Sequence, residues 1–333
     1  MNYDLGAEHE SLGRTVTTII AKYYGALGGA LVSSEATPTD LEKIFDEPLP
    51  LEGAESVDEI LKRFEQDVLP HAMNIPSPRY YGLFNPAPLP IAVWADALAS
   101  AINQNGAAWR NSPSANVIQA RVIRWLCEVM GYDKSESFGT LCSGGSEANL
   151  IGLKCARDRA AAQARDHGVR STAGGDLTVY ASEQCHYSLI KSVDILGLGR
   201  NSLRKIPTDD RYRIRLDALR EEIEKDLKSD RVPCCVCGAA GATSTGVVDD
   251  LAALAQVARS YNVWFHVDAA YGGALSFSGK HKHELHGIEK ADSITIDPHK
   301  WMFIPIACGA VLVRDGPSVL REAFDITPGF PHC

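Results

Sequence analysis

Residues 251–268, LAALAQVARSYNVWFHVD, contain the pattern that decides the fold. Apolar side chains recur at helical spacing over residues 251–260, and residues 263–267 then form a short apolar run typical of a buried strand. A second helical pattern covers residues 216–227. Three other segments have the same strand-like character: residues 177–181, 233–239 and 293–296. Strands that alternate with helices predict an α/β fold with a mainly parallel sheet covered by helices on both faces.

The N-terminal part has a different pattern. Residues 1–75 are predicted to form a helical segment broken by an acidic, proline-containing loop, and residues 76–333 the large α/β domain. Residues 15–27 have a helical pattern, and Ser56 with Glu59 has the spacing of a capping box at a helix start. Two further helices are predicted at residues 94–102 and 115–130.

Composition and charge exclude several classes of protein. The chain is 45% hydrophobic, which argues against disorder, and it has no apolar run long enough for a membrane span. Its 33 basic and 42 acidic residues give a net charge of −9, without a basic cluster for nucleic acid or an anionic membrane. The polar start, MNYD, predicts a cytoplasmic protein, and nine cysteines without a regular framework favour reduced thiols over metal or disulfide roles.

Polar clusters follow four of the predicted strands. They cover residues 182–188, 241–245, 266–271 and 297–301. Ligands of open parallel sheets bind outside the carboxyl ends of the strands, so these clusters predict one shared site. A separate loop at residues 142–149 contains two glycines and opens into a predicted helix over residues 150–164. Such a loop can bind phosphate at the helix start or be a simple turn, and its glycine spacing fits neither a P-loop nor a dinucleotide fingerprint.

Asp268 and Lys300 lie in apolar surroundings at two of these strand ends. They are either a structural ion pair or a functional carboxylate and a nucleophilic amine. His186 is a core histidine, a stacking group or an acid–base residue. The histidine-rich residues 281–286 have a spacing that fits zinc, but a solvated loop is favoured, and no metal site is predicted.

The combination of these groups favours one cofactor. Pyridoxal 5'-phosphate needs a lysine for its aldehyde, a carboxylate for its ring nitrogen and N–H donors for its phosphate. A glycine loop at a helix start, Asp268, His186 and Lys300 meet those needs at neighbouring strand ends.

The same residues resemble the group II pyridoxal-phosphate-dependent amino-acid decarboxylases, the family of aromatic-amino-acid, glutamate and histidine decarboxylases. The resemblance covers roughly residues 50–325 and is strongest in five motifs: PRYYGLFNP (78–86), SGGSEAN (143–149), SEQCHYS (182–188), HVDAAYGG (266–273) and DPHKW (297–301). It implies a fold-type I, aspartate-aminotransferase-like domain. It also implies a C-terminal truncation, because the chain stops about where a catalytic loop and a small C-terminal domain are expected.

The resemblance implies a role for each matching residue. Lys300 would form the Schiff base, Asp268 would pair with the pyridine nitrogen, and His186 would stack on the ring. Further cofactor contacts are implied for Gly145, Ser146, Ser188, Thr243, Ala270 and His299. Substrate contacts are implied for Phe84, Asn85, Asn105 and Ala107, the last two in a segment that a partner subunit contributes.

The function implied is decarboxylation of an L-amino acid to the amine and CO2 through a quinonoid intermediate, in a homodimer with the site at the subunit interface. Asn105 and Ala107 are less bulky than an aromatic-substrate pocket requires, so the substrate stays open. The alternatives are transamination, decarboxylation coupled to oxidative deamination, and an inactive truncated homologue that binds cofactor or a partner subunit.

Overall fold

The structure, a computed structural model, describes residues 5–49, 56–106, 109–169 and 174–324. The chain divides into two compact units, Met1–Ala87 and Pro88–Cys333. The first contains the helices α1 (Leu5–Ala26), α2 (Pro38–Phe45) and α3 (Val57–Arg63). The predicted capping box begins α3: the Glu59 backbone N–H donates to Ser56 Oγ, and the Ser56 N–H donates to Glu59 Oε2. Residues 76–87 go with this unit, and the predicted domain division at residue 75 stays a prediction.

The second unit is built around a seven-stranded sheet in the order β1-β7-β6-β5-β4-β2-β3. Its strands are β1 (Phe138–Cys142), β2 (Leu177–Ser182), β3 (Leu203–Ile206), β4 (Val232–Ala239), β5 (Trp264–Asp268), β6 (Ser293–Ile296) and β7 (Gly309–Val313). The strands from β6 to β3 are parallel to one another, and β7 runs antiparallel to both of its neighbours. This mainly parallel sheet confirms the predicted fold class.

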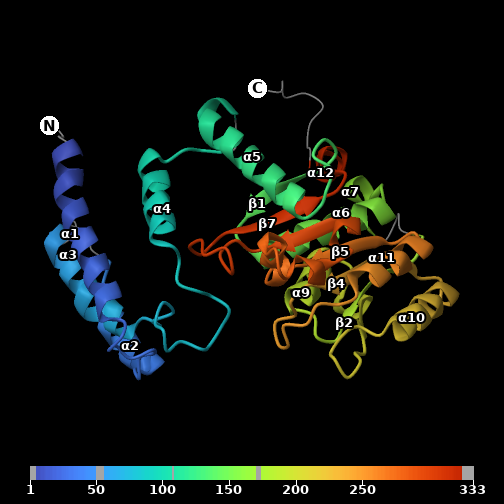
Figure 1. Cartoon of the computed structure of the whole chain (residues 1–333), viewed down its shortest axis with the longest axis horizontal. Coiled ribbons are helices and arrows are strands. Elements are labelled where there is room, and N and C mark those ends of the chain that lie inside the picture. The colour runs from blue at the N-terminus through green and yellow to red at the C-terminus, as the bar shows by residue number, and fades with distance from the viewer. Residues whose placement is uncertain (1–4, 50–55, 107–108, 170–173, 325–333) are drawn as a thin grey trace. The chain divides into compact units, whose positions relative to one another are not determined.

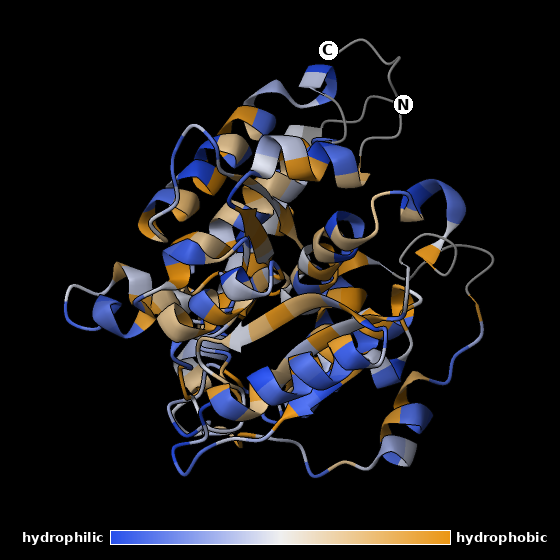
Figure 2. Ribbon diagram, turned by 90° about the vertical axis from the view of Figure 1, so that its right-hand side faces the viewer, coloured by the Kyte–Doolittle hydropathy of each residue, from blue (hydrophilic) through white to orange (hydrophobic). Residues whose placement is uncertain are grey.

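Helices cover both faces of the sheet (Figure 1). One face packs against α5 (Pro113–Val129), α10 (Leu216–Lys228) and α11 (Leu251–Ser260), and the other packs against α6 (Gly145–Ala160), α7 (Ala164–His167), α9 (Ser188–Ile195) and α12 (Gly316–Phe324). Figure 2 shows the result, with apolar strands inside and helices that are polar on their outer surfaces. Two separate apolar cores follow from this three-layer arrangement.

The remaining helix, α4 (Pro90–Ile102), is different because none of its residues is buried. It begins with proline at its first position and ends at Asn103, which adopts the left-handed conformation of a C-cap. Within the part of the chain that the structure describes, every helix is too short or too polar to cross a lipid bilayer.

Cysteine thiols are concentrated in the core on the α6 side of the sheet. Cys235 and Cys237 lie on β4 with their sulfur atoms 3.7 Å apart, and both are buried. Burial raises the pKa of Cys234 to about 12 and that of Cys185 to about 11. These thiols are therefore protonated at neutral pH.

A buried ion pair joins the two strands at one edge of the sheet, β2 and β3, to a helix. Asp226 on α10 accepts two hydrogen bonds from the Arg204 guanidinium, at 2.9 and 2.8 Å, and a third from the Tyr180 hydroxyl at 2.9 Å. Burial alone would raise the pKa of Asp226, but these hydrogen bonds outweigh it and the pKa lies below its ordinary value. The contacts join β2, β3 and α10.

We predict that Asp226→Asn lowers the free energy of unfolding by roughly 3 kcal/mol at pH 7, because it removes the buried carboxylate that accepts two hydrogen bonds from the Arg204 guanidinium. The folded-state pKa is depressed, so the stabilisation by Asp226 is fully present above the unfolded pKa near 3.9 and lost as the pH falls through the folded value. Urea unfolding of the variant and the parent at several pH values measures both effects. Asp194→Asn, in an exposed pair with Arg200, is the control and should change little. A variant as stable as the parent at pH 7 would contradict this role.

Candidate active site

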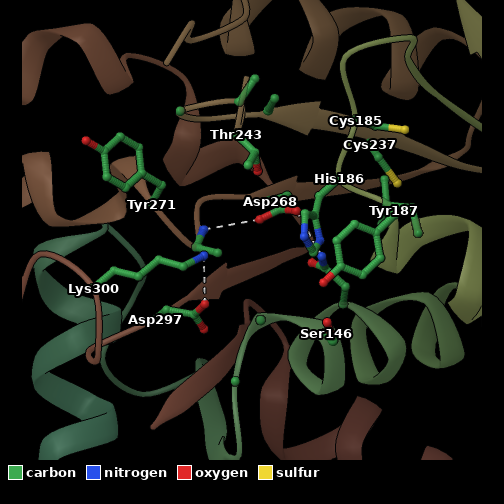
Figure 3. Close-up of a pocket in the computed structure, with 18 of the residues that line it drawn as sticks. Ser146, Cys185, His186, Tyr187, Cys237, Thr243, Asp268, Tyr271, Asp297 and Lys300 are labelled. Carbon is green, nitrogen blue, oxygen red and sulfur yellow. Dashed lines mark hydrogen bonds and ion pairs between the residues drawn. The ribbon is translucent and has the colours of Figure 1, made fainter. Parts of the chain in front are cut away.

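A pocket of about 350 Å³ lies at the carboxyl ends of the parallel strands. All four predicted polar clusters contribute to its lining, together with the glycine loop before α6. The parallel register of β2, β4, β5 and β6 explains this convergence, because their last residues end at the same edge. Figure 3 shows Asp268, His186, Thr243 and Lys300 around one open space.

Lys300 extends into the pocket from the loop that follows β6. Its Nζ lies 3.0 Å from Asp297 Oδ2, and His299 Nε2 lies 3.7 Å from the same oxygen. Asp297 is buried, and its other oxygen, Oδ1, has no hydrogen-bond partner among the described residues. Burial raises the pKa of Asp297 above its ordinary value, and the nearby Lys300 ammonium offsets this only in part. The pair with Asp297 is one that the sequence analysis did not predict.

Asp268 ends β5, and both of its oxygens accept hydrogen bonds. Oδ1 accepts one from the Ala270 backbone N–H at 3.2 Å, and Oδ2 accepts one from Asn149 Nδ2 at 2.9 Å. These bonds hold the carboxylate in place while it still faces the pocket. A structural ion pair between Asp268 and Lys300, one of the two alternatives from the sequence, is absent from the ion pairs of the described residues, and Lys300 contacts Asp297 instead.

His186 lies beside Asp268 in Figure 3. Its Nδ1 is 2.8 Å from the Ser188 hydroxyl and 3.3 Å from the Ser188 backbone nitrogen. Burial lowers the pKa of His186, against the attraction of Asp268. The imidazole is therefore neutral at neutral pH, and it presents a flat ring to the pocket.

The glycine loop is part of the helix start. Helix α6 begins at Gly145, earlier than the predicted residue 150, and its first backbone N–H groups border the pocket. Glu147 accepts hydrogen bonds from the backbone and the hydroxyl of Ser143, at 2.8 and 2.6 Å, which fix the loop. A Cβ on Gly309 of β7 would lie 2.5 Å from the Gly144 Cα. Only glycine therefore lets this strand approach the loop so closely.

The structure brings most of the predicted site residues together. The pocket is lined by Gly145, Ser146, His186, Thr243, Asp268, Ala270, His299 and Lys300. Ser188 is buried behind His186 and is not among the lining residues. Phe84 and Asn85 belong to the first unit, Asn105 is exposed after α4, and Ala107 lies outside the described residues.

Two residues with direct contacts to this site were missed by the sequence analysis, Asn149 and Asp297. Asn149 ends the motif SGGSEAN and Asp297 begins the motif DPHKW, but the functional roles were assigned to other residues of these motifs. Among the described residues, no group of three or more His, Cys, Asp or Glu side chains could hold a metal ion, and this includes the segment 281–286.

Comparison with known proteins gives consistent results. Residues 38–330 match the family described as the pyridoxal-dependent decarboxylase conserved domain. The chain is 33% identical to an L-tyrosine/L-DOPA decarboxylase 2 of Lophophora williamsii over 94% of its length and 60% of the relative's. It is 29% identical to a phenylacetaldehyde synthase of Petunia hybrida, over 95% and 62%. The chain thus spans about three fifths of the length of these curated relatives.

A solved structure resembles the whole described fold. The structure of Catharanthus roseus tryptophan decarboxylase in complex with L-tryptophan superposes with a TM-score of 0.89 at 30% identity. The match covers 98% of this chain and 70% of the other. The likeness to the group II decarboxylases stated from the sequence motifs is thereby confirmed.

We predict that Asp297→Asn stabilises the fold at pH 7, because a buried carboxylate with a raised pKa opposes folding once it is ionised. The destabilisation by ionised Asp297 is fully present above the folded-state pKa of this carboxyl group and disappears below its unfolded-state pKa near 3.9. Urea midpoints should therefore be higher for the variant at pH 7 and converge with the parent as the pH approaches 4. Asp315→Asn, at an exposed carboxylate, is the control. A lower midpoint for Asp297→Asn at pH 7 would show that the ion pair with Lys300 dominates instead.

Proposed function

Because this chain belongs to the pyridoxal-dependent decarboxylase family, we propose that it removes the α-carboxyl group of an L-amino acid as CO2 and leaves the amine. The cofactor of this family is pyridoxal phosphate. The observation that carries the proposal is the convergence of Lys300, Asp268 and His186 on one pocket.

The donor set of the pocket fits that cofactor. The pocket offers an amine, a carboxylate and a flat aromatic ring, which match the cofactor's aldehyde, ring nitrogen and ring face. At the helix start, a Cβ on Gly145 would lie 2.9 Å from Asp297 Oδ2 and 3.1 Å from the Ala270 Cβ. Glycine therefore leaves the N–H groups of α6 accessible to a phosphate, which the helix dipole also favours. Gly145, Ser146 and Thr243 would hold the phosphate.

When bound, the cofactor supplies an aldehyde for the amine and an electron sink for the bond that breaks. Lys300 would supply the amine that holds the cofactor in the pocket. Asp297, 3.0 Å from Lys300 Nζ, keeps that side chain in the pocket and accepts a proton from it. Lys300 has to lose a proton before it can act as a nucleophile.

Asp268 and His186 act on the ring. Asp268 would pair with the ring nitrogen of the cofactor, because its carboxylate faces the pocket. His186 would lie against the ring face and, as a neutral imidazole, would add no charge there. His299 lies near the same Asp297 oxygen that Lys300 contacts. Together they orient the cofactor so that one bond of the substrate is cleaved.

An aromatic L-amino acid is the first substrate to test. Two of the relatives are named for tyrosine, DOPA and tryptophan, and Tyr271, which lines the pocket, packs against Trp301 with ring centres 4.4 Å apart and ring planes tilted by 49°. A second candidate is decarboxylation coupled to oxidative deamination, which the likeness to a phenylacetaldehyde synthase favours. Aldehyde, ammonia and peroxide as products would identify it, whereas a decarboxylase gives the amine.

We further propose a homodimer that uses the exposed face of α4. Ile91, Trp94, Leu98 and Ile102 recur at helical spacing on this helix, and all four are exposed. A large apolar patch of this kind marks a protein–protein contact. The segment predicted to reach the partner's substrate pocket, residues 101–109, begins at the end of this helix. The cytoplasmic location stays a prediction.

We predict that the chain incubated with pyridoxal phosphate shows the absorbance band of a lysine imine, and that Lys300→Ala abolishes it. Borohydride reduction followed by peptide mass mapping should place the cofactor on Lys300. Any decarboxylation should fall by roughly 10³-fold or more in the variant. Lys282→Ala, in an exposed loop, is the control and should keep the band. Labelling of a different lysine, or an unchanged band, would refute the assignment of Lys300.

We predict that Leu98→Glu converts a dimer to a monomer in sedimentation velocity, because the charge would be buried in the contact. Leu227→Glu introduces the same charge at an exposed position on α10 and should leave the mass unchanged. A parent chain that is monomeric at micromolar concentration would contradict the proposed contact.

A further inference from the structure

A buried polar network connects α6 to the strands beneath it. Asn149 lies one turn inside the helix, and its side chain contacts His266 on β5 and Thr295 on β6. All three residues are buried. Gly152, on the next turn of α6, leaves room for the imidazole, since a Cβ there would lie 2.7 Å from the His266 ring. The helix and sheet are therefore packed around hydrogen bonds at this point rather than around apolar side chains.

The direction of each hydrogen bond follows from its donors. Asn149 Oδ1 can only accept, so His266 Nε2, 2.9 Å away, has the proton and donates to it. His266 Nδ1 is left to accept from the Ser293 hydroxyl at 2.8 Å, and Ser293 Oγ itself accepts from Trp264 Nε1–H at 2.9 Å. Burial lowers the pKa of His266 to about 4, which agrees with a neutral ring.

The amide group of Asn149 points the other way, toward the pocket. Nδ2 donates to Asp268 Oδ2 at 2.9 Å and to Ser188 Oγ at 2.9 Å. The serine hydroxyl in turn donates to His186 Nδ1 at 2.8 Å. The Ser188 backbone N–H, which can only donate, points at the same Nδ1, so His186 has its proton on Nε2.

We propose that Asn149 is a positioning residue that holds Asp268 and His186 as one hydrogen-bonded unit and fixes the proton of His186 on Nε2. The proposal rests on the proposed function, because it assigns these two residues to the cofactor ring. Asn149 uses both amide hydrogens and accepts two hydrogen bonds at Oδ1, so its full capacity is engaged. No other side chain of this size offers two donors on one side and an acceptor on the other.

The hydrogen bonds of Asn149 have a chemical consequence at both Asp268 and His186. At Asp268, the Asn149 N–H donor holds Oδ2, and the carboxylate keeps the orientation in which it faces the pocket. At His186, the Nε2–H becomes the hydrogen that faces away from Ser188 and is available to a bound molecule. A single amide therefore positions both groups.

Asn149→Asp tests the donor role with almost no change of size. It replaces the donor facing Asp268 by an oxygen, so two carboxyl groups stand about 2.9 Å apart and share a proton. We expect pyridoxal phosphate to bind at least tenfold more weakly at pH 7.5, measured by absorbance titration. Asn116→Asp, a part-buried amide on α5 that donates to the Ser112 carbonyl, is the matched control and should bind as the parent does.

The tautomer of His186 in the cofactor-free protein tests the second part of the proposal, the link from Asn149 through Ser188 to His186. Long-range ¹H–¹⁵N spectra, assigned with His186→Gln, should show His186 protonated on Nε2 in the parent. Ser188→Ala removes the shorter of the two hydrogen bonds to His186 Nδ1 and leaves only the 3.3 Å backbone bond, so the Nε2–H tautomer of His186 should become less populated while His266 stays unchanged. Ser192→Ala, a buried serine on the same helix, is the control and should leave the His186 signals unchanged.

The two arms separate this proposal from the function on which it rests. A parent chain that fails to attach pyridoxal phosphate to Lys300 refutes the proposed function, and the tautomer spectra still decide the role of Asn149. Parent-like binding by Asn149→Asp, or a His186 tautomer that Ser188→Ala does not change, would overturn the inference. Weaker binding together with a less populated Nε2–H tautomer of His186 would support it.

Discussion

The common direction of β2, β4, β5 and β6 is the constraint on which the site depends. Parallel strands place their carboxyl ends at one edge, and each loop that leaves this edge contributes a side chain to the same pocket. Helix α6 begins at that edge as well, so its free N–H groups face the same space. An amine, a carboxylate, an imidazole and a helix start come together without any of them being close in sequence.

The fold was largely predictable because its signals are local. The four central strands were predicted within one residue of their observed bounds, since each is a short apolar run next to a clear helix. The strands β1, β3 and β7 were missed. β3 is short and contains Arg204 and Lys205, and β7 was not separated from the apolar residues before it. The sheet order also needed the structure, because nothing in the residues of β7 indicates that it runs antiparallel between β1 and β6.

The site was predictable where a residue type has a distinctive chemistry, as with Lys300, Asp268 and His186. It was not predictable where the role depends on a partner distant in sequence. Asn149 contacts Asp268 across 119 positions of the chain, and an asparagine inside a helix has no signal that reveals such a contact. A pair between Lys300 and the carboxylate on β5 was one of the two alternatives considered, whereas Asp297, three residues before the lysine, is the group that touches it.

The protonated thiols of the core have a practical consequence. Thiolates are the form that reacts with alkylating reagents, and burial keeps Cys127, Cys155, Cys234 and Cys235 out of that form. The rate at which they are alkylated therefore reports how often the sheet opens to solvent. Cys185 and Cys237 line the pocket itself, so their protection reports occupancy as well. Alkylation of the native cysteines can therefore measure transient opening of the sheet and the occupancy of the pocket, without an engineered label.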